Sequence, residues 1–433
     1  MRVTVEPAKR LRGTLAVPGD KSIGHRALLF GALAEGTTHV DGIPGGEDVA
    51  STRRCLEALG VATRDTGEDA LAIEGRAGEF SAPHERLDCG NSGTTMRLLA
   101  GILAGRALDA TLDGDASLRA RPMRRIAEPL RAMGARIELD GENGDRAPMR
   151  VHGSAALKAL DYALPVASAQ VKSALLLAAL AARGTTTLAG ALNSRDHTER
   201  MLPVFGARLA RRNGTLTIDG GQRLLAADII VPGDVSSAAF WIAAASIVPN
   251  SRVVIENVGL NPTRTGFLDV LQRMGAGLDI RLEREDPEPI GTLVASTSRL
   301  TATDVEPHEI PALIDELPLL AVVAAFAEGT TRVRGAEELR HKESDRIDAV
   351  VANGRAMGMQ IDETSDGFAV HGHGHGAKNL HGAQLDARGD HRIAMAFAIA
   401  ALAAEGPTQI DGAKSAAVSY PQFFSTLESL RDA

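Results

Sequence analysis

Apolar segments of about a dozen residues recur along this chain, each followed by a turn and a short stretch of alternating residues. They occur at 27–36, 96–105, 171–184, 238–250, 317–329 and 393–406. Such segments are apolar on every side and too short to cross a bilayer. The pattern therefore predicts six helices buried in a protein core, each running into a strand.

A second, more charged helix is predicted after each of these strands. The amphipathic stretches lie at 48–59, 123–133, 197–205, 263–274, 344–357 and 421–430. Four of them stop at a glycine, as expected for a residue that closes a helix in a left-handed conformation: Gly60, Gly134, Gly206 and Gly275. Short alternating stretches such as 136–139 and 215–218 follow as strands. The chain thus repeats an α/β unit six times.

The tetrapeptide Val-Pro-Gly-Asp occurs twice, at 17–20 and 231–234, and divides the six units into two groups of three. Pro followed by Gly is typical of a turn. A length of 433 residues also exceeds what one hydrophobic core usually supports. We therefore predict two domains joined by a paired hinge that closes on a ligand, against the alternative that a common turn sequence recurs by chance.

Composition narrows the function classes. A formal charge of −8 argues against a general binder of polyanions, and 3% aromatic residues leave few platforms for stacking nucleic-acid bases. Two cysteines, Cys55 and Cys89, suggest a reducing compartment and fit small core residues better than nucleophiles. The first residues resemble no signal or transit segment, so we expect a cytoplasmic protein.

Candidate binding and catalytic side chains lie at the polar N-terminal ends of the buried helices, where the helix dipole attracts anions. Lys21, Arg26 and Arg392 oppose that dipole at a cost of about 0.3–1 kcal/mol each unless an anion is bound nearby. Ser, Thr, Asn and Gly at these ends also serve as ordinary helix caps. Arg121 lies in a loop before a helix, and the run 338–346 concentrates ionisable groups. For that run a solvated helix start is an equal alternative.

These motifs together resemble the 3-phosphoshikimate 1-carboxyvinyltransferase, or EPSP synthase, family. The resemblance runs the whole length in order, through 18–22, 90–97, 121–123, 168–173, 314–318, 340–346 and 390–392. It implies a two-domain inside-out α/β barrel of six βαβαββ units. The implied domains are 20–232, and 1–19 with 233–433, with hinges near 17–20 and 231–234.

The resemblance implies transfer of the enolpyruvyl group of phosphoenolpyruvate to the 5-hydroxyl of shikimate 3-phosphate, with release of phosphate. It implies no metal and no organic cofactor. We expect these two small molecules as the only partners, with neither nucleic acid nor membrane, and a monomer. The chemistry needs cations for the phosphates and carboxylates, a base for the hydroxyl, and an acid for the methylene carbon.

Site residues carried over by motif fall into three sets. The catalytic set is Asp315, Glu343, Lys21 and Lys342. The set for shikimate 3-phosphate is Lys21, Ser22, Arg26, Ser168, Ala169, Gln170, Ser194, Arg195, Asp315 and Lys342. The set for phosphoenolpyruvate is Lys21, Gly93, Arg121, Gln170, Arg346 and Arg392, with Gly93 leaving room for close backbone approach.

Two departures from the family pattern weaken parts of this transfer. Val418 stands where some relatives have a lysine, so no cation is assigned there. Leu98 stands where others have a proline, which leaves the spacing around Gly93, and sensitivity to glyphosate, open.

Two other functions remain open. UDP-N-acetylglucosamine enolpyruvyl transferase shares the fold and donor, but a reactive cysteine is expected before its Arg-Pro, and the loop 113–121 has none. A non-catalytic binder of anionic metabolites would need the cations but neither Asp315 nor Glu343.

The run 371–376 alternates histidine with glycine. We expect it to be an exposed hairpin tip, with a metal site as the alternative.

Overall fold

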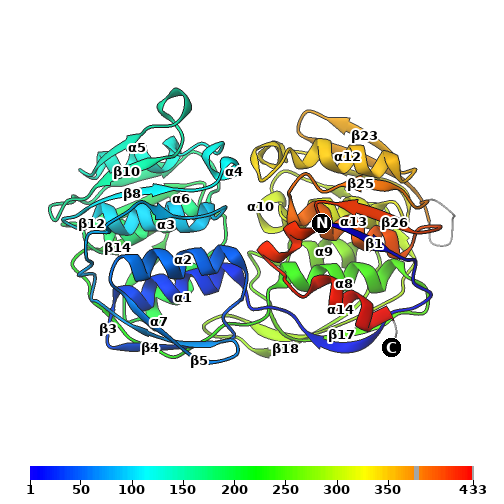
Figure 1. Cartoon of the computed structure of the whole chain (residues 1–433), viewed down its shortest axis with the longest axis horizontal. Coiled ribbons are helices and arrows are strands. Elements are labelled where there is room, and N and C mark those ends of the chain that lie inside the picture. Colours follow the sequence, from blue (N-terminus) through cyan, green and yellow to red (C-terminus); the bar gives the residue numbers. More distant parts are fainter. Residues whose placement is uncertain (375–379, 432–433) are drawn as a thin grey trace. The chain divides into compact units, whose positions relative to one another are not determined.

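In the computed structural model, which describes residues 1–374 and 380–431, the chain divides into two units. Gly19–Val231 forms one, called here the N-terminal unit. Met1–Pro18 and Pro232–Ala433 form the other, called the C-terminal unit. Figure 1 shows sheets and helices alternating in each unit. The first 18 residues thus cluster with the second half of the chain.

Three buried helices form the interior of the N-terminal unit. They are α1 (Lys21–Leu33), α3 (Gly93–Ala104) and α6 (Ala169–Ala179). Each has a serine or aspartate as N-cap, whose side chain accepts a hydrogen bond from a backbone N–H in the first turn. The surface helices are α2 (Glu47–Ala58), α4 (Ala116–Arg119), α5 (Arg124–Ala132) and α7 (His197–Val204), with a 3₁₀ turn η1 (Glu142–Gly144).

Three four-stranded sheets surround these helices, and all three have one pattern: a parallel pair followed by two antiparallel neighbours. In spatial order the first is β16 (Ile229–Ile230), β4 (Thr37–Asp41), β6 (Ala70–Glu74) and β5 (Ala62–Gly67). The second is β7 (Leu87–Asp88), β8 (Asp109–Asp113), β10 (Met149–His152) and β9 (Arg136–Leu139). The third is β11 (Asp161–Leu164), β12 (Thr185–Gly190), β14 (Thr215–Asp219) and β13 (Leu209–Arg212). β3 (Ala34–Glu35) and β15 (Leu224–Leu225) form a short parallel pair.

The C-terminal unit repeats this arrangement. Its buried helices are α8 (Val235–Ile247), α11 (Leu317–Ala324) and α13 (His391–Leu402), and every residue of the three is buried. The other helices are α9 (Gly266–Arg273), α10 (Ile310–Leu313), α12 (Arg346–Ala356) and α14 (Phe423–Arg431), with 3₁₀ turns η2 (Glu337–His341) and η3 (Ala413–Val418). A helix that is apolar on every face has no polar face to offer water, so these helices must lie in the core of the unit.

Each sheet of the C-terminal unit also contains a parallel pair. In spatial order one is β18 (Gly277–Arg284), β19 (Ile290–Ser296), β17 (Arg252–Gly259) and β2 (Arg12–Ala16). The next is β20 (Leu300–Thr301), β22 (Ala327–Val333), β24 (Gly367–His373) and β23 (Gln360–Thr364), with β21 (Asp304–Val305) also on β22. The last is β1 (Arg2–Val5), β26 (Thr408–Asp411) and β25 (Gln384–Asp386). β2 pairs in parallel with β17, β20 with β22, and β25 with β26.

Each connection between the units follows a strand that pairs within its own unit. β2, which precedes the first crossing, is parallel to β17 in the C-terminal unit, and β16, which precedes the second, is parallel to β4 in the N-terminal unit. Beside the crossings, the N–H of Asp234 donates to the Pro18 carbonyl at 2.8 Å. A side chain at Gly19 would meet the Gly42 carbonyl oxygen at 1.9 Å, so only glycine fits there. Both crossings lie in the Val-Pro-Gly-Asp segments.

The predicted repeat of buried helix, strand and surface helix is confirmed, with one systematic difference. Helices α1, α3, α6, α8 and α13 begin at the polar heads rather than at the first apolar residue, because the capping side chain sets the start. The hairpin-tip expectation for 371–376 is wrong for His371 and His373, which lie within strand β24. His371 hydrogen-bonds Asp362 and Thr330, which holds it on the sheet. His375 and Gly376 lie outside the described residues.

None of the described helices is long and apolar enough to span a membrane. Within the same residues, no group of three or more His, Cys, Asp or Glu side chains is arranged to hold a metal ion.

We expect an aromatic cluster to hold the C-terminal helix to its unit. The Phe423 ring stacks on Trp241 with centroids 5.0 Å apart and meets Tyr420 edge-on at 5.8 Å. Phe423→Ala should lower the free energy of unfolding of this unit by about 3–5 kcal/mol, because it removes a fully buried ring. Urea titration followed by fluorescence of Trp241, the one tryptophan of the chain, measures this unit. Phe424→Ala, a half-buried neighbour, should cost clearly less; equal losses would contradict the prediction.

Candidate active site

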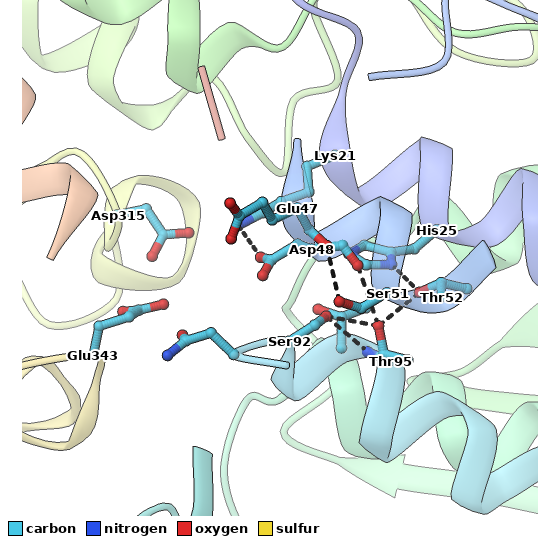
Figure 2. A network of polar contacts seen from close by, with 12 residues as sticks. Lys21, His25, Glu47, Asp48, Ser51, Thr52, Ser92, Thr95, Asp315 and Glu343 are labelled. Carbon is cyan, nitrogen blue, oxygen red and sulfur yellow. Dashed lines mark hydrogen bonds and ion pairs between the residues drawn. The ribbon is translucent and has the colours of Figure 1, made fainter. Parts of the chain in front are cut away.

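The head of α1 presents a lysine whose charge is already matched by a protein carboxylate. The Asp20 side chain caps the helix by accepting from the N–H of Ile23 at 2.9 Å. Lys21 Nζ lies 2.9 Å from Asp48 Oδ2 in the first turn of α2, as Figure 2 shows. An anion therefore does accompany the cation at this helix end, as the dipole argument requires, and it is a side chain.

A chain of buried polar side chains links helices α1, α2 and α3 in the N-terminal unit (Figure 2). His25 Nδ1 on α1 lies 2.7 Å from the hydroxyl of Thr52 on α2, which lies 2.6 Å from that of Thr95 on α3. The Thr95 hydroxyl donates to Ser92 Oγ, the N-cap of α3, at 2.7 Å. The heads carrying Lys21 and Gly93 are thus held at a fixed spacing by side chains that are themselves fully enclosed.

His25 is neutral in this chain of contacts. Burial lowers its pKa to about 3, because the surroundings cannot solvate an imidazolium; the nearby charge of Asp48 opposes this shift without reversing it. A neutral ring suits a site where one nitrogen faces a hydroxyl and the other, Nε2, has no hydrogen-bond partner among the described residues.

Two guanidinium groups flank Gly93. A Cβ atom added at this glycine would lie 2.9 Å from Arg97 Nη1 and 3.3 Å from Arg121 Nη1. Arg121 donates to Asn91 Oδ1 at 2.7 Å, which fixes its orientation. The space in front of Gly93 is therefore bounded by two permanent cations that present planar donors, an arrangement suited to phosphate or carboxylate oxygens.

Gln170, at the head of α6, joins this group. Its Nε2 donates to the Thr94 hydroxyl at 3.0 Å, and its Oε1 accepts from Arg97 Nη1. Ser168 is the N-cap of α6 and accepts from the N–H of Val171 at 3.4 Å. The heads of α3 and α6 thus lie side by side, joined through Gln170.

Arg26 is buried and binds hydroxyls of the neighbouring helices α6 and α7. Its Nε donates to Thr198 Oγ1 at 2.7 Å and its Nη2 to Ser173 Oγ at 2.8 Å. Its Nη1 donates to the Ser22 carbonyl at 2.9 Å, which fixes the first turn of α1. Its charge is therefore enclosed beside the residues predicted to bind shikimate 3-phosphate.

Ser194 is the one predicted ligand of this unit whose hydroxyl is buried without a hydrogen-bond partner among the described residues. A buried hydroxyl costs free energy unless its hydrogen bond is made. This geometry favours a ligand oxygen as the missing partner.

In the C-terminal unit three carboxylates converge on one arginine. Arg346 Nη2 lies 2.6 Å from Glu343 Oε2, Nη1 lies 3.2 Å from Asp315 Oδ1, and Nε lies 2.8 Å from Asp390 Oδ2. Burial acts to lower the pKa of this guanidinium, and the three carboxylates together raise it above its ordinary value. Arg346 therefore holds the carboxyl groups of Asp315 and Glu343 in fixed positions relative to each other.

Two further predicted cations lie in the C-terminal unit. Lys342 Nζ lies 3.5 Å from Asp315 Oδ1. Asp390 caps α13 by accepting from the N–H of Arg392 at 2.8 Å, and Arg392 Nη1 lies 3.5 Å from Glu316 Oε1. As with Lys21, a protein carboxylate stands beside the cation at the helix head.

Comparison with known proteins decides what these features belong to. Residues 5–427 match the family model described as EPSP synthase (3-phosphoshikimate 1-carboxyvinyltransferase). The chain belongs to the EPSP synthase family.

Curated relatives named 3-phosphoshikimate 1-carboxyvinyltransferase support this membership. The protein of Shouchella clausii is 50% identical over 97% of this chain and 97% of its own length. The protein of Bacillus subtilis is 48% identical over 98% of each.

Solved structures agree in fold. EPSP synthase from Acinetobacter baumannii superposes with a TM-score of 0.88 at 42% identity, covering 99% of this chain and 98% of that one. The enolpyruvyl transferase NikO from Streptomyces tendae has a TM-score of 0.79 at 19% identity, covering 99% of this chain and 96% of that one. The second likeness concerns the fold alone. The predicted α/β architecture and the family resemblance are confirmed.

Four residues of this EPSP synthase family member that the sequence did not single out contact predicted site residues in the structure. Arg97 borders Gly93, Asp48 pairs with Lys21, Asp390 binds Arg346, and Glu316 faces Arg392. Arg97 was detectable, since it is a cation in the first turns of a buried helix, as Arg26 is. The three carboxylates were not, because ordinary acidic residues come to these positions only through the fold.

Stability should depend on pH through His25. Its folded pKa of about 3 lies below its ordinary value, so the unfolded chain binds a proton that the folded protein excludes. The contribution is complete above about pH 6.5 and is lost as pH falls towards 3, at on the order of 1 kcal/mol per pH unit. Denaturant titrations at pH 7 and pH 5 should show a smaller acid loss for His25→Asn than for wild type. His39→Asn, an exposed control, should keep the wild-type loss; an unchanged loss in His25→Asn would refute this account.

Proposed function

We propose that this chain transfers the enolpyruvyl group of phosphoenolpyruvate to the 5-hydroxyl of shikimate 3-phosphate, giving 5-enolpyruvylshikimate 3-phosphate and phosphate. The observation that carries the proposal is the family match over residues 5–427. The arrangement of two carboxylates on one buried arginine supplies the chemistry that such a transfer needs.

The phosphoenolpyruvate site in this proposal draws on the cations around Gly93. Arg121 and Gln170 bind the donor beside that glycine, together with Lys21, Arg346 and Arg392. Arg97, which approaches the same glycine, joins this set. Planar guanidinium groups suit the carboxylate and phosphate of the donor, because each offers paired donors.

The shikimate 3-phosphate site lies, in this proposal, along the heads of α1 and α6 and the segment before α7. Its residues are Lys21, Ser22, Arg26, Ser168, Ala169, Gln170, Ser194 and Arg195, with Asp315 and Lys342 from the C-terminal unit. The unpartnered hydroxyl of Ser194 supports a ligand oxygen at that point. Since the residues belong to both units, the proposal includes the closing motion about 17–20 and 231–234.

Catalysis requires proton transfers at two atoms. Asp315 takes the proton from the 5-hydroxyl as the oxygen attacks C2 of phosphoenolpyruvate, and Glu343 delivers a proton to the methylene carbon C3. Glu343, now a carboxylate, then takes a proton back from C3 as the C2–O bond to phosphate breaks, which restores the carbon–carbon double bond and releases phosphate. Lys21 and Lys342 stabilise the negative charge on the phosphate and on the carboxylates during both steps.

The remaining expectations are part of the proposal. We propose that the protein works in the cytoplasm as a monomer, without metal or organic cofactor. As a further hypothesis, the space in front of Gly93 admits glyphosate; unaffected turnover at saturating glyphosate would count against it.

Release of phosphate with the two substrates tests the proposal directly. Wild type should release phosphate from phosphoenolpyruvate when shikimate 3-phosphate is the acceptor and not when UDP-N-acetylglucosamine is. Asp315→Ala should fold and lose activity by at least about 100-fold, because the base is gone. Asp304→Asn, an exposed carboxylate of the same unit, is the control. A receptor without catalysis would release no phosphate, and activity with the UDP-sugar alone would identify the other transferase.

Glycine at position 93 should be required for donor binding. Gly93→Ala places a methyl group 2.9 Å from Arg97 Nη1, so a guanidinium must move away from the donor. We expect KM for phosphoenolpyruvate to rise by about tenfold or more, with KM for shikimate 3-phosphate little changed. At Gly45 an added Cβ meets nothing within 4 Å, so Gly45→Ala should leave both constants unchanged. Equal KM values in Gly93→Ala and wild type would exclude this role.

A further inference from the structure

Lys172 has no part in the function proposed above, yet it is a fully buried charge beside the proposed acceptor site. It lies in the second turn of α6, and its side chain is 0% exposed. Its Nζ lies 2.7 Å from Glu199 Oε1, 3.2 Å from the Leu192 carbonyl and 3.1 Å from the Ser194 carbonyl. An ammonium has three N–H donors, and these three oxygens use all of them.

A charge in this position is costly. Removing an ammonium from water has a large penalty, which a single carboxylate rarely recovers in full. Burial lowers the pKa of Lys172, and the charge and hydrogen bond of Glu199 act in the opposite direction. A leucine or methionine would fill similar space without that penalty, so packing alone does not account for the lysine.

The two carbonyls show what the lysine does. They belong to alternate residues of the segment between β12 and α7, so one side chain fixes the path of that segment against α6. Asn193 lies between these two residues, and Arg195 follows Ser194. The Ser194 hydroxyl is buried and has no hydrogen-bond partner among the described residues, which requires its position to be set from the backbone.

We propose that Lys172 is a positioning residue for the phosphate of shikimate 3-phosphate. It holds the backbone at Leu192 and Ser194 so that the Ser194 hydroxyl and the Arg195 side chain lie where the phosphate binds. This inference rests on the proposed function and deepens it, since it identifies what gives the acceptor site its preference for a phosphorylated ligand. Glu199 serves to keep the ammonium charged.

Steady-state kinetics of Lys172→Met tests the inference. We expect KM for shikimate 3-phosphate to rise by about tenfold or more, with KM for phosphoenolpyruvate within about twofold of wild type. Since this variant leaves Glu199 buried without its partner, the double variant Lys172→Met/Glu199→Met is measured beside it. The double variant should regain thermal stability and keep the raised KM. A purely structural lysine would give the opposite result, with KM returning as stability returns.

Two controls sharpen the test. Glu199→Gln keeps a hydrogen-bond acceptor for the ammonium and both carbonyl contacts, so its KM for shikimate 3-phosphate should stay within about threefold of wild type. Calorimetric titration with shikimate 3-phosphate and with shikimate compares the ligand with and without its phosphate. Lys172→Met should weaken binding of the first and leave the second unchanged; equal weakening of both would overturn the inference.

The design separates the two proposals. Absence of phosphate release by wild type would refute the proposed function, whatever the variants do. Normal release by wild type and by Lys172→Met, with unchanged KM for shikimate 3-phosphate, would refute the role of Lys172 alone.

Discussion

The structure depends on the cations at the N-terminal ends of its helices. Each opposes the dipole of its own helix, and each is placed where little water can solvate it. The fold compensates with carboxylates from other elements: Asp48 beside Lys21, Glu316 beside Arg392, and a trio of carboxylates around Arg346. Beyond their first two turns the buried helices carry no charged side chain, because their charged groups lie near the N-terminal ends.

This compensation shapes binding. A substrate anion arriving at Lys21 meets an ammonium that already has a partner at 2.9 Å, so the ligand must share or replace Asp48. A singly charged anion gains little by such an exchange, since it offers the ammonium no more than the carboxylate does. In the proposed function, ligands carrying both phosphate and carboxylate gain more, because they would engage more than one cation. The proposed specificity for multiply charged metabolites is thus compatible with ion pairs that stabilise the protein itself.

The sequence predicts local features of the fold well and distant pairings poorly. Apolar composition locates the buried helices, and glycines such as Gly60 and Gly134 mark where the amphipathic ones stop, because both signals lie within a few residues. Pairing of β1 with β26 joins residues at opposite ends of the chain, and no local pattern encodes it. The same holds for the site: cations stand out in apolar surroundings, whereas Asp48 or Asp390 becomes special only after folding. The sequence motifs supplied Asp315 and Glu343 through family resemblance rather than through chemistry visible in the chain.

Buried polar groups of the N-terminal unit illustrate two ways of meeting the same constraint. His25 avoids the cost of burying a charge by remaining neutral. Its Nδ1 hydrogen-bonds the hydroxyl of Thr52, which is connected through Thr95 to Ser92. Lys172 keeps the strong donors of an ammonium and encloses them with oxygens. Neutral relays fix the spacing of helices that are already rigid, whereas a charged donor can hold an irregular backbone segment that has few contacts of its own. The first device therefore suits the helix heads and the second suits the irregular segment between β12 and α7.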